Sequence, residues 1–177
     1  MTLSDEVHDV FQAAQSNDVM KLKTLLKTNK TLSNTENDDG LTPLGYAAHF
    51  GHKDAVQALL DYGASVNEIS HSKIDFIPSN TALHAAIAGA RNLQVIQLLL
   101  NHGADPNILD SNGHICLHTA AFHEDNRTII EMLINHGAEV NLLDLEGKTA
   151  LQLAKEKGHD EVAKLLKGYE VKGGPYD

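Results

Sequence analysis

Apolar residues recur along the chain in short clusters with helical spacing, and glycines or polar turns separate the clusters. A cluster of small residues precedes each cluster of larger ones. The pattern therefore predicts short helices in pairs, an inner helix rich in Ala followed by an outer helix rich in Leu and Ile. The larger clusters are Val56, Leu59 and Leu60; Val95, Ile96, Leu98 and Leu99; Ile129, Ile130, Met132 and Leu133; and Val162, Leu165 and Leu166. Small side chains on the inner helices let neighbouring helices approach closely.

The residues that begin and end one such pair have clear roles. Thr42 can accept backbone N–H bonds as an N-cap, and Pro43 suits the first helical position. Gly51 ends this inner helix, an outer helix follows from about Lys53 to Tyr62, and Gly63 closes it. The prediction is a turn, a helix, a short loop and a second helix.

Two sequence phrases repeat in step with these helix pairs. The first opens each inner helix and reads Thr42-Pro43-Leu44-Gly45-Tyr46-Ala47-Ala48, Thr81-Ala82-Leu83-His84-Ala85-Ala86, Ile115-Cys116-Leu117-His118-Thr119-Ala120 and Thr149-Ala150-Leu151-Gln152-Leu153-Ala154, at spacings of 39, 34 and 34 residues. The second follows the outer helices as Tyr62-Gly63-Ala64-Ser65-Val66-Asn67, His102-Gly103-Ala104-Asp105-Pro106-Asn107 and His136-Gly137-Ala138-Glu139-Val140-Asn141. A period near 33 with a T-P-L-H-x-A core is typical of ankyrin repeats. From about residue 5 to 167 the chain resembles that family.

The resemblance and the period divide the chain into five units. We expect a degenerate N-terminal capping repeat at 1–36, a second repeat at 37–69, a third at 70–109 with an inserted long finger at 70–80, a fourth at 110–143, a C-terminal capping repeat at 144–167 and a flexible tail at 168–177. Polar helices in the first and last units suit the ends of an array, because an end repeat has a neighbour on one side only. The two polar caps favour a complete array over a fragment of a larger scaffold.

The resemblance implies an all-α solenoid of stacked helix-turn-helix units whose turns project as β-hairpin fingers. It also implies a protein-binding module that acts as an adaptor, an inhibitor or a regulatory factor. Members of the family contact partners with fingertips and with the inner-helix positions after the Ala-Ala pair. In this chain the fingertip positions are Asp38, Asp39, Leu41, Ser111, Asn112, His114, Leu145, Glu146 and Lys148. The inner-helix positions are His49, Phe50, Phe122 and His123.

Two sets of apolar residues have two interpretations each. Phe50 and Phe122 each lie beside a His, which suits either a binding hot spot or packing against the next inner helix. Ile74, Phe76 and Ile77 lie in the long finger, which either contacts a partner or covers the neighbouring fingers.

Eleven histidines raise the alternative of a metal-binding or catalytic groove. Most of them follow the repeat, since His84 and His118 share one motif position and His102 and His136 share another. The chain has no H-E-x-x-H motif and no Cys pair, so we expect no metal, no cofactor and no catalytic residue. The single cysteine, Cys116, replaces Pro in the motif and is expected to be packed and inert.

Charge and composition narrow the class of partner. The net charge is -10, from 24 acidic and 14 basic residues. Nucleic acids and anionic membranes are disfavoured, because binding to them depends on Lys and Arg, whereas a protein with a basic surface remains compatible. The start of the chain lacks a signal peptide pattern, and no apolar run is long enough to span a membrane, so we expect a cytoplasmic location. We also expect the chain to be a monomer. Modification of Asn67, Asn107 or Asn141 stays open, although capping of the hairpins is the favoured role.

Overall fold

The computed structural model describes the backbone of residues 1–172 and the side chains of residues 1–170. The described residues form ten α-helices and one 3-10 helix, and none of them lies in a strand. The elements are α1 (Leu3–Ser16), α2 (Val19–Thr28), η1 (Lys30–Asn34), α3 (Pro43–His49), α4 (Lys53–Asp61), α5 (Ala82–Ala88), α6 (Leu93–Asn101), α7 (Cys116–His123), α8 (Arg127–Asn135), α9 (Ala150–Lys157) and α10 (Asp160–Lys172).

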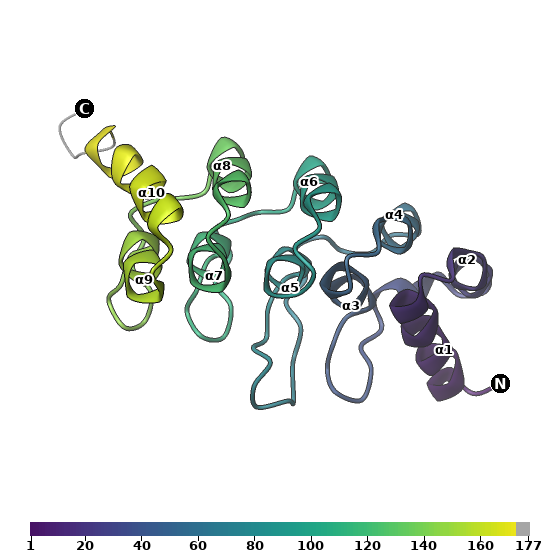
Figure 1. Ribbon diagram of the computed structural model, residues 1–177. Coiled ribbons are helices and arrows are strands. Elements are labelled where there is room, and N and C mark those ends of the chain that lie inside the picture. Colours follow the sequence, from purple (N-terminus) through teal and green to yellow (C-terminus); the bar gives the residue numbers. More distant parts are fainter. Residues whose placement is uncertain (173–177) are drawn as a thin grey trace. The chain divides into compact units, whose positions relative to one another are not determined.

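The chain folds into two compact units. Unit 1 comprises Met1–Ala104 and holds α1 to α6, and unit 2 begins at Asp105 and holds α7 to α10. In unit 1 the inner helices α1, α3 and α5 pack in that order, and the outer helices α2, α4 and α6 form a second layer (Figure 1). In unit 2, α7 packs on α9 and α8 packs on α10. The predicted all-α architecture of paired helices is confirmed.

The helix caps follow the sequence pattern. The Thr42 hydroxyl accepts the backbone N–H of Gly45, and the Thr149 hydroxyl accepts that of Gln152. In the opposite direction, the Gln152 side chain accepts the N–H of Thr149 and completes a capping box. Gly51 has a φ of 73°, the left-handed conformation that ends a helix at small cost for glycine.

The core of each unit is the seam between its inner and outer helices. Leu59 of α4 and Leu99 of α6 are fully buried in unit 1, and Leu133 of α8 is fully buried in unit 2. The inner helices contribute small residues, including Ala48 and Ala86, which are also buried. This division of large and small side chains is the one that the apolar pattern predicts.

Two features of the ends differ from the sequence pattern. The short helix η1 follows α2, because Asn29 Oδ1 accepts the N–H of Thr31 and Leu32 turns inward to full burial. At the other end α10 continues to Lys172, although the expected tail begins at residue 168. Gly168 lies inside a helix that starts at Asp160, and a single glycine costs a helix about 1 kcal/mol, which does not end it. The remaining part of the expected tail, 173–177, lies outside the described residues.

No helix within residues 1–172 is both long enough and apolar enough to cross a membrane.

Candidate protein-binding surface

Three short fingers share one construction. We call residues 37–41 finger 2, residues 110–114 finger 4 and residues 144–148 finger 5. In each finger the first residue, Asn37, Asp110 or Asp144, accepts the backbone N–H groups two and four positions later with its Oδ1 atom. Its own N–H donates to the carbonyl four positions later, at 2.9–3.1 Å. The fingertips are therefore fixed turns, closed by hydrogen bonds without strands.

Electrostatics support the turn in finger 5. Burial of the Asp144 carboxylate raises its pKa, but hydrogen bonds from the N–H groups of Lys148 and Glu146 outweigh burial and leave the pKa below its ordinary value. His114 of finger 4 also contacts this carboxylate, with 3.3 Å between His114 Nε2 and Asp144 Oδ2. The ionised form of Asp144 is thus favoured, and its contact with His114 links finger 4 to finger 5.

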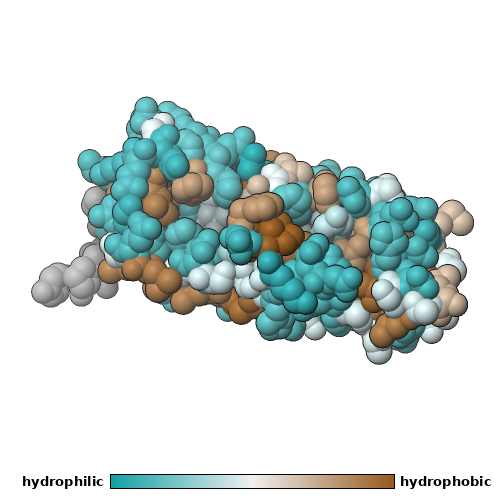
Figure 2. Space-filling model, turned by 90° about the horizontal axis from the view of Figure 1, so that it is seen from below, coloured by the Kyte–Doolittle hydropathy of each residue, from teal (hydrophilic) through white to brown (hydrophobic). Residues whose placement is uncertain are grey.

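Most of the predicted fingertip residues are exposed. Asp38 and Asp39 of finger 2, Ser111 and Asn112 of finger 4, and Leu145 and Glu146 of finger 5 are all in the exposed class, with Leu145 at 78%. The other three, Leu41, His114 and Lys148, are half-buried. In each unit the fingers extend to one side of the inner helices (Figure 1). Figure 2, turned by 90° from the view of Figure 1, shows apolar residues among hydrophilic ones on the surface.

The long finger, residues 70–80, is held against finger 2. The N–H of His71 donates to the carbonyl of Gly40, and the N–H of Lys73 donates to the carbonyl of Asp39, both at 2.9 Å. His71 Nδ1 also lies 2.6 Å from Glu36 Oε1, and this hydrogen bond raises the pKa of the exposed His71 side chain. Finger 2 and the long finger therefore form one structural element of unit 1, which we call the paired fingers.

Hydrogen bonds also fix the interior of the long finger. The buried Ser70 exchanges two bonds with Asn80: its N–H donates to the Asn80 carbonyl and its hydroxyl accepts the Asn80 N–H. The N–H of Ser72 donates to the Ser79 hydroxyl at 3.0 Å. These bonds close the base of the loop, so its tip is presented on an ordered backbone.

The three apolar residues of the long finger have different environments. Ile74 and Ile77 are half-buried, whereas Phe76 is 86% exposed. The two isoleucines are therefore partly covered, and Phe76 is the one of the three whose side chain is open to solvent. Contact of this loop with a partner stays a prediction.

The inner-helix pair in unit 1 belongs to an aromatic cluster. The Phe50 ring lies edge-on to Tyr46 at 5.1 Å and to His49 at 5.2 Å, and it stacks on His52 at 6.3 Å. Tyr46 continues the cluster to the buried Phe11. Phe50 remains 36% exposed, so packing covers only part of this side chain.

The corresponding pair in unit 2 has a charged neighbour. The ammonium group of Lys157 lies 4.1 Å from the centroid of the Phe122 ring, in cation–π geometry. Phe122 contacts His123 edge-on and is 40% exposed. This surface is more polar than the one around Phe50.

Repeat-related histidines serve the fold. The His118 ring is buried between turns, with Nε2 3.0 Å from the Leu142 carbonyl and 3.1 Å from the Lys148 carbonyl. Burial lowers the pKa of His118, against the opposing effect of the Lys148 carbonyl, so the neutral ring is favoured. Other rings also contact backbone carbonyls: His52, His102, His136 and His159. Among the residues that the structure describes, no group of three or more His, Cys, Asp or Glu side chains could hold a metal ion.

A ladder of asparagines joins successive repeats within each unit. The side-chain amide of Asn34 donates to the Gly63 carbonyl, and that of Asn67 donates to the Gly103 carbonyl, at 2.9 and 3.0 Å. Asn107 makes the same bond to Gly137 in unit 2. Asn67 and Asn107 therefore link neighbouring repeats through these bonds, a contact different from the hairpin capping expected from the sequence. Asn141, the next in this series, is exposed.

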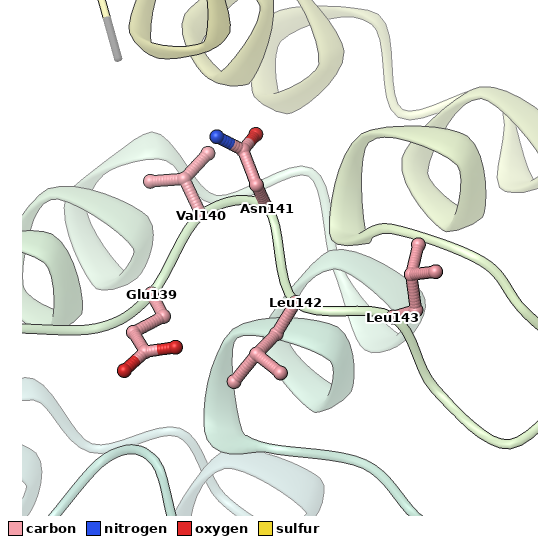
Figure 3. A pocket seen from close by; sticks show the side chains of 5 residues that line it. All are labelled: Glu139, Val140, Asn141, Leu142 and Leu143. Carbon is pink, nitrogen blue, oxygen red and sulfur yellow. The ribbon is translucent and has the colours of Figure 1, made fainter. Parts of the chain in front are cut away.

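A shallow depression lies along residues 139–143 of unit 2 (Figure 3). Val140 and Asn141 point to one side of this loop, whereas Glu139 and Leu142 point to the other. A site for a small molecule needs polar groups that converge on a hollow. The side chains here diverge, so the depression does not provide one.

Comparison with known proteins adds a family match. A family model described as ankyrin repeats (3 copies) matches residues 10–110 and 83–173. Palmitoyltransferase akr1 of Neurospora crassa is 32% identical over 114 residues, which is 64% of this chain and 15% of that protein. Serine/threonine-protein kinase VIK of Arabidopsis thaliana is 38% identical over 90 residues, 51% of this chain and 19% of that protein. Putative ankyrin repeat protein YahD of Escherichia coli is 29% identical over 128 residues, 72% of this chain and 44% of that protein. The chain thus spans less than half the length of each of these relatives.

Proposed function

Because this chain belongs to the ankyrin-repeat family, whose repeats are generally protein-interaction modules, we propose that it binds a partner protein through its fingertips and the exposed ends of its inner helices. The role is that of an adaptor, an inhibitor or a regulatory factor. Two of its relatives are named as enzymes, a palmitoyltransferase and a protein kinase, but the match to this chain covers only 15% and 19% of their lengths. We propose that the chain itself supplies no catalytic group.

One observation carries the proposal: large apolar side chains are exposed at fingertips whose backbone is fixed. Phe76 is 86% exposed and Leu145 is 78% exposed, and both lie on turns closed by hydrogen bonds. The backbone that carries these side chains loses little conformational freedom on binding because it is already ordered, which favours association. Exposed aromatic and aliphatic residues are also common anchors at protein interfaces.

The finer features of the proposal follow from charge and sequence. The net charge of -10 favours a partner with a basic surface and disfavours nucleic acid. We propose a monomer that works in the cytoplasm, where its single cysteine, the buried Cys116, stays reduced.

Site-specific photo-crosslinking tests the binding surface. A photoreactive phenylalanine analogue is placed at Phe76 or Leu145 in the fingers, or at Lys53 or Thr128 on the outer helices, and the chain is irradiated in lysate of its own cell. Lys53 and Thr128 are matched controls, because they are also exposed, one in each unit. We expect a discrete protein adduct from the finger positions only. Adducts of equal yield from all four positions, or adducts from the outer helices alone, contradict the proposal.

A further inference from the structure

Phe76 is the most exposed aromatic residue for which the structure gives an exposure, and its exposure is not the result of a loose loop. The other three phenylalanines, Phe11, Phe50 and Phe122, are 6%, 36% and 40% exposed. Phe76 is 86% exposed on a segment bonded to finger 2 by two backbone hydrogen bonds and closed internally by Ser70 and Ser72. An ordered backbone that holds an aromatic ring in water maintains an unfavourable contact with solvent, and burial of the ring by another molecule relieves it.

The surroundings of Phe76 are acidic. Residues 36–41 and 68–80 contain five carboxylates and one lysine. Asp75 precedes Phe76, and Asp38 and Asp39 lie on the finger whose carbonyls accept the N–H groups of the long finger. The carboxylates of Asp38, Asp39 and Asp75 are exposed and make no hydrogen bond or ion pair with any described residue. The paired fingers thus present an aromatic ring together with three uncompensated negative charges.

Fingers 4 and 5 of unit 2 have a different balance. Lys148 bonds to Glu146 and Glu156 at 3.1 Å each, and the Asp144 carboxylate accepts backbone N–H groups. The charges around the exposed Leu145 are therefore largely satisfied within the chain. This contrast distinguishes the paired fingers from the other fingertips and gives them a preference for cationic partners.

We propose that the paired fingers bind a basic amphipathic segment of a partner protein. Phe76 packs against the apolar face of that segment, and Asp38, Asp39 and Asp75 pair with Lys or Arg side chains that flank the face. This inference rests on the proposed protein-binding function and adds to it the chemistry and the place of one contact.

Fluorine NMR with defined peptides tests the inference. The chain contains four phenylalanines, so uniform 4-fluorophenylalanine labelling gives four resonances that single Phe→Leu variants assign. The probes are a helical peptide of Leu and Lys with segregated faces and its counterpart with Glu in place of every Lys. We expect the Lys peptide to shift the Phe76 resonance in a manner that added salt weakens. The Glu peptide leaves that resonance unchanged.

Variants give the size of the effect, measured as the affinity for a labelled Lys peptide. Phe76→Ser is expected to weaken binding about thirtyfold, as for the loss of an interface hot spot. The triple change Asp38→Asn, Asp39→Asn and Asp75→Asn is expected to weaken it about tenfold, since each exposed pair contributes a factor of about two. Met20→Ser is the matched control, because Met20 is a similarly exposed apolar residue, at 83%, that lies on the outer helix α2 outside the fingers, and its loss is expected to leave the affinity unchanged. Thermal melting confirms that each variant is folded.

Three outcomes with the peptides, and a fourth with lipid vesicles, overturn the inference. The first is no shift of Phe76 with either peptide, and the second is an equal shift with both. The third is a shift confined to Phe50 or Phe122, which places the contact on the inner helices. In each case the crosslinking experiment still decides separately whether the chain binds a protein through its fingers. A Phe76 shift produced by phosphatidylserine vesicles but not by the Lys peptide also contradicts the assignment of a basic protein partner.

Discussion

The contact between finger 2 and the long finger can be tested by replacing three equivalent glycines with alanine. Gly40, Gly113 and Gly147 occupy the same position of their fingers and have φ angles of 76°, 76° and 77°. Replacement by alanine imposes the same backbone strain at all three positions. The space for the new methyl group differs. At Gly40 it would lie 1.9 Å from the carbonyl oxygen of His71, whereas at Gly147 no atom lies within 4 Å.

The magnitudes follow from this geometry. Gly147→Ala is expected to cost about 1–2 kcal/mol, the cost of a left-handed conformation for an L-residue. Gly40→Ala carries this cost as well and also forces the two fingers apart, which breaks the bonds from His71 and Lys73. Two hydrogen bonds at about 0.5–1.5 kcal/mol each add about 1–3 kcal/mol. Gly113→Ala is expected to be intermediate, because the nearest obstructing atom, Leu145 Cγ, belongs to an exposed side chain and moves when that side chain changes rotamer.

Urea unfolding followed by circular dichroism measures the three losses of stability, with the m-value fitted for each variant. The predicted order of destabilisation is Gly40→Ala, then Gly113→Ala, then Gly147→Ala. Equal losses for Gly40→Ala and Gly147→Ala would show that the two fingers are not held together in solution. The paired fingers would then cease to be a single element.

Further predictions concern the core, the long finger and the pH dependence of stability. Leu133→Ala is expected to lower the free energy of unfolding by about 2–5 kcal/mol, because the side chain is fully buried in unit 2; a loss below about 1 kcal/mol in urea unfolding would contradict its place in the core. Phe76→Ser is expected to leave the melting temperature nearly unchanged, whereas the double change Ile74→Ser and Ile77→Ser lowers it, since only the isoleucines are half-buried. A melting experiment with the reverse result would refute the assignment of packing to the isoleucines and of partner contact to Phe76. Burial lowers the pKa of His118 from its ordinary 6.5, so the unfolded chain takes up a proton more readily than the folded one. The stability that the neutral ring contributes is therefore complete above about pH 6.5 and declines as the pH falls below it. Urea unfolding midpoints between pH 7.5 and 5.5 measure this decline in stability. His118→Gln, which introduces the residue found at the equivalent position of α9, should reduce the decline. If the variant shows the same decline, other titrating groups cause it.

Much of the fold could be predicted because its determinants are local. Thr42 and Thr149 cap helices through bonds to residues three positions away, and Gly51 ends a helix by its own conformation. The helix pairs also repeat, so one prediction serves every repeat. The continuation of α10 past Gly168 was not predicted. A glycine near the expected end of a helix suggests that the helix ends there, but the free-energy cost of one glycine inside a helix is small.

The candidate site depended more on contacts between distant residues. The sequence singled out Phe50 and Phe122 as exposed pairs with histidine, and the structure shows that packing uses part of each ring. Lys157, which lies over Phe122, belongs to the next repeat, and no local pattern places it there. The pairing of finger 2 with the long finger depends on backbone hydrogen bonds, which any residue type can make and which the sequence therefore does not reveal. Only the composition of the long finger, with the apolar residues Ile74, Phe76 and Ile77 in an inserted loop, gave a signal that the structure could refine.

Hydroxyl-radical footprinting of the partner complex tests most directly whether the fingers are the contact surface. Phe76 and Met20 are almost equally exposed in the free chain, at 86% and 83%, and Met20 lies on the outer helix α2. We predict that complex formation slows the oxidation of Phe76 and leaves the rate at Met20 unchanged. Protection of Met20 with an unaltered rate at Phe76 would contradict the account.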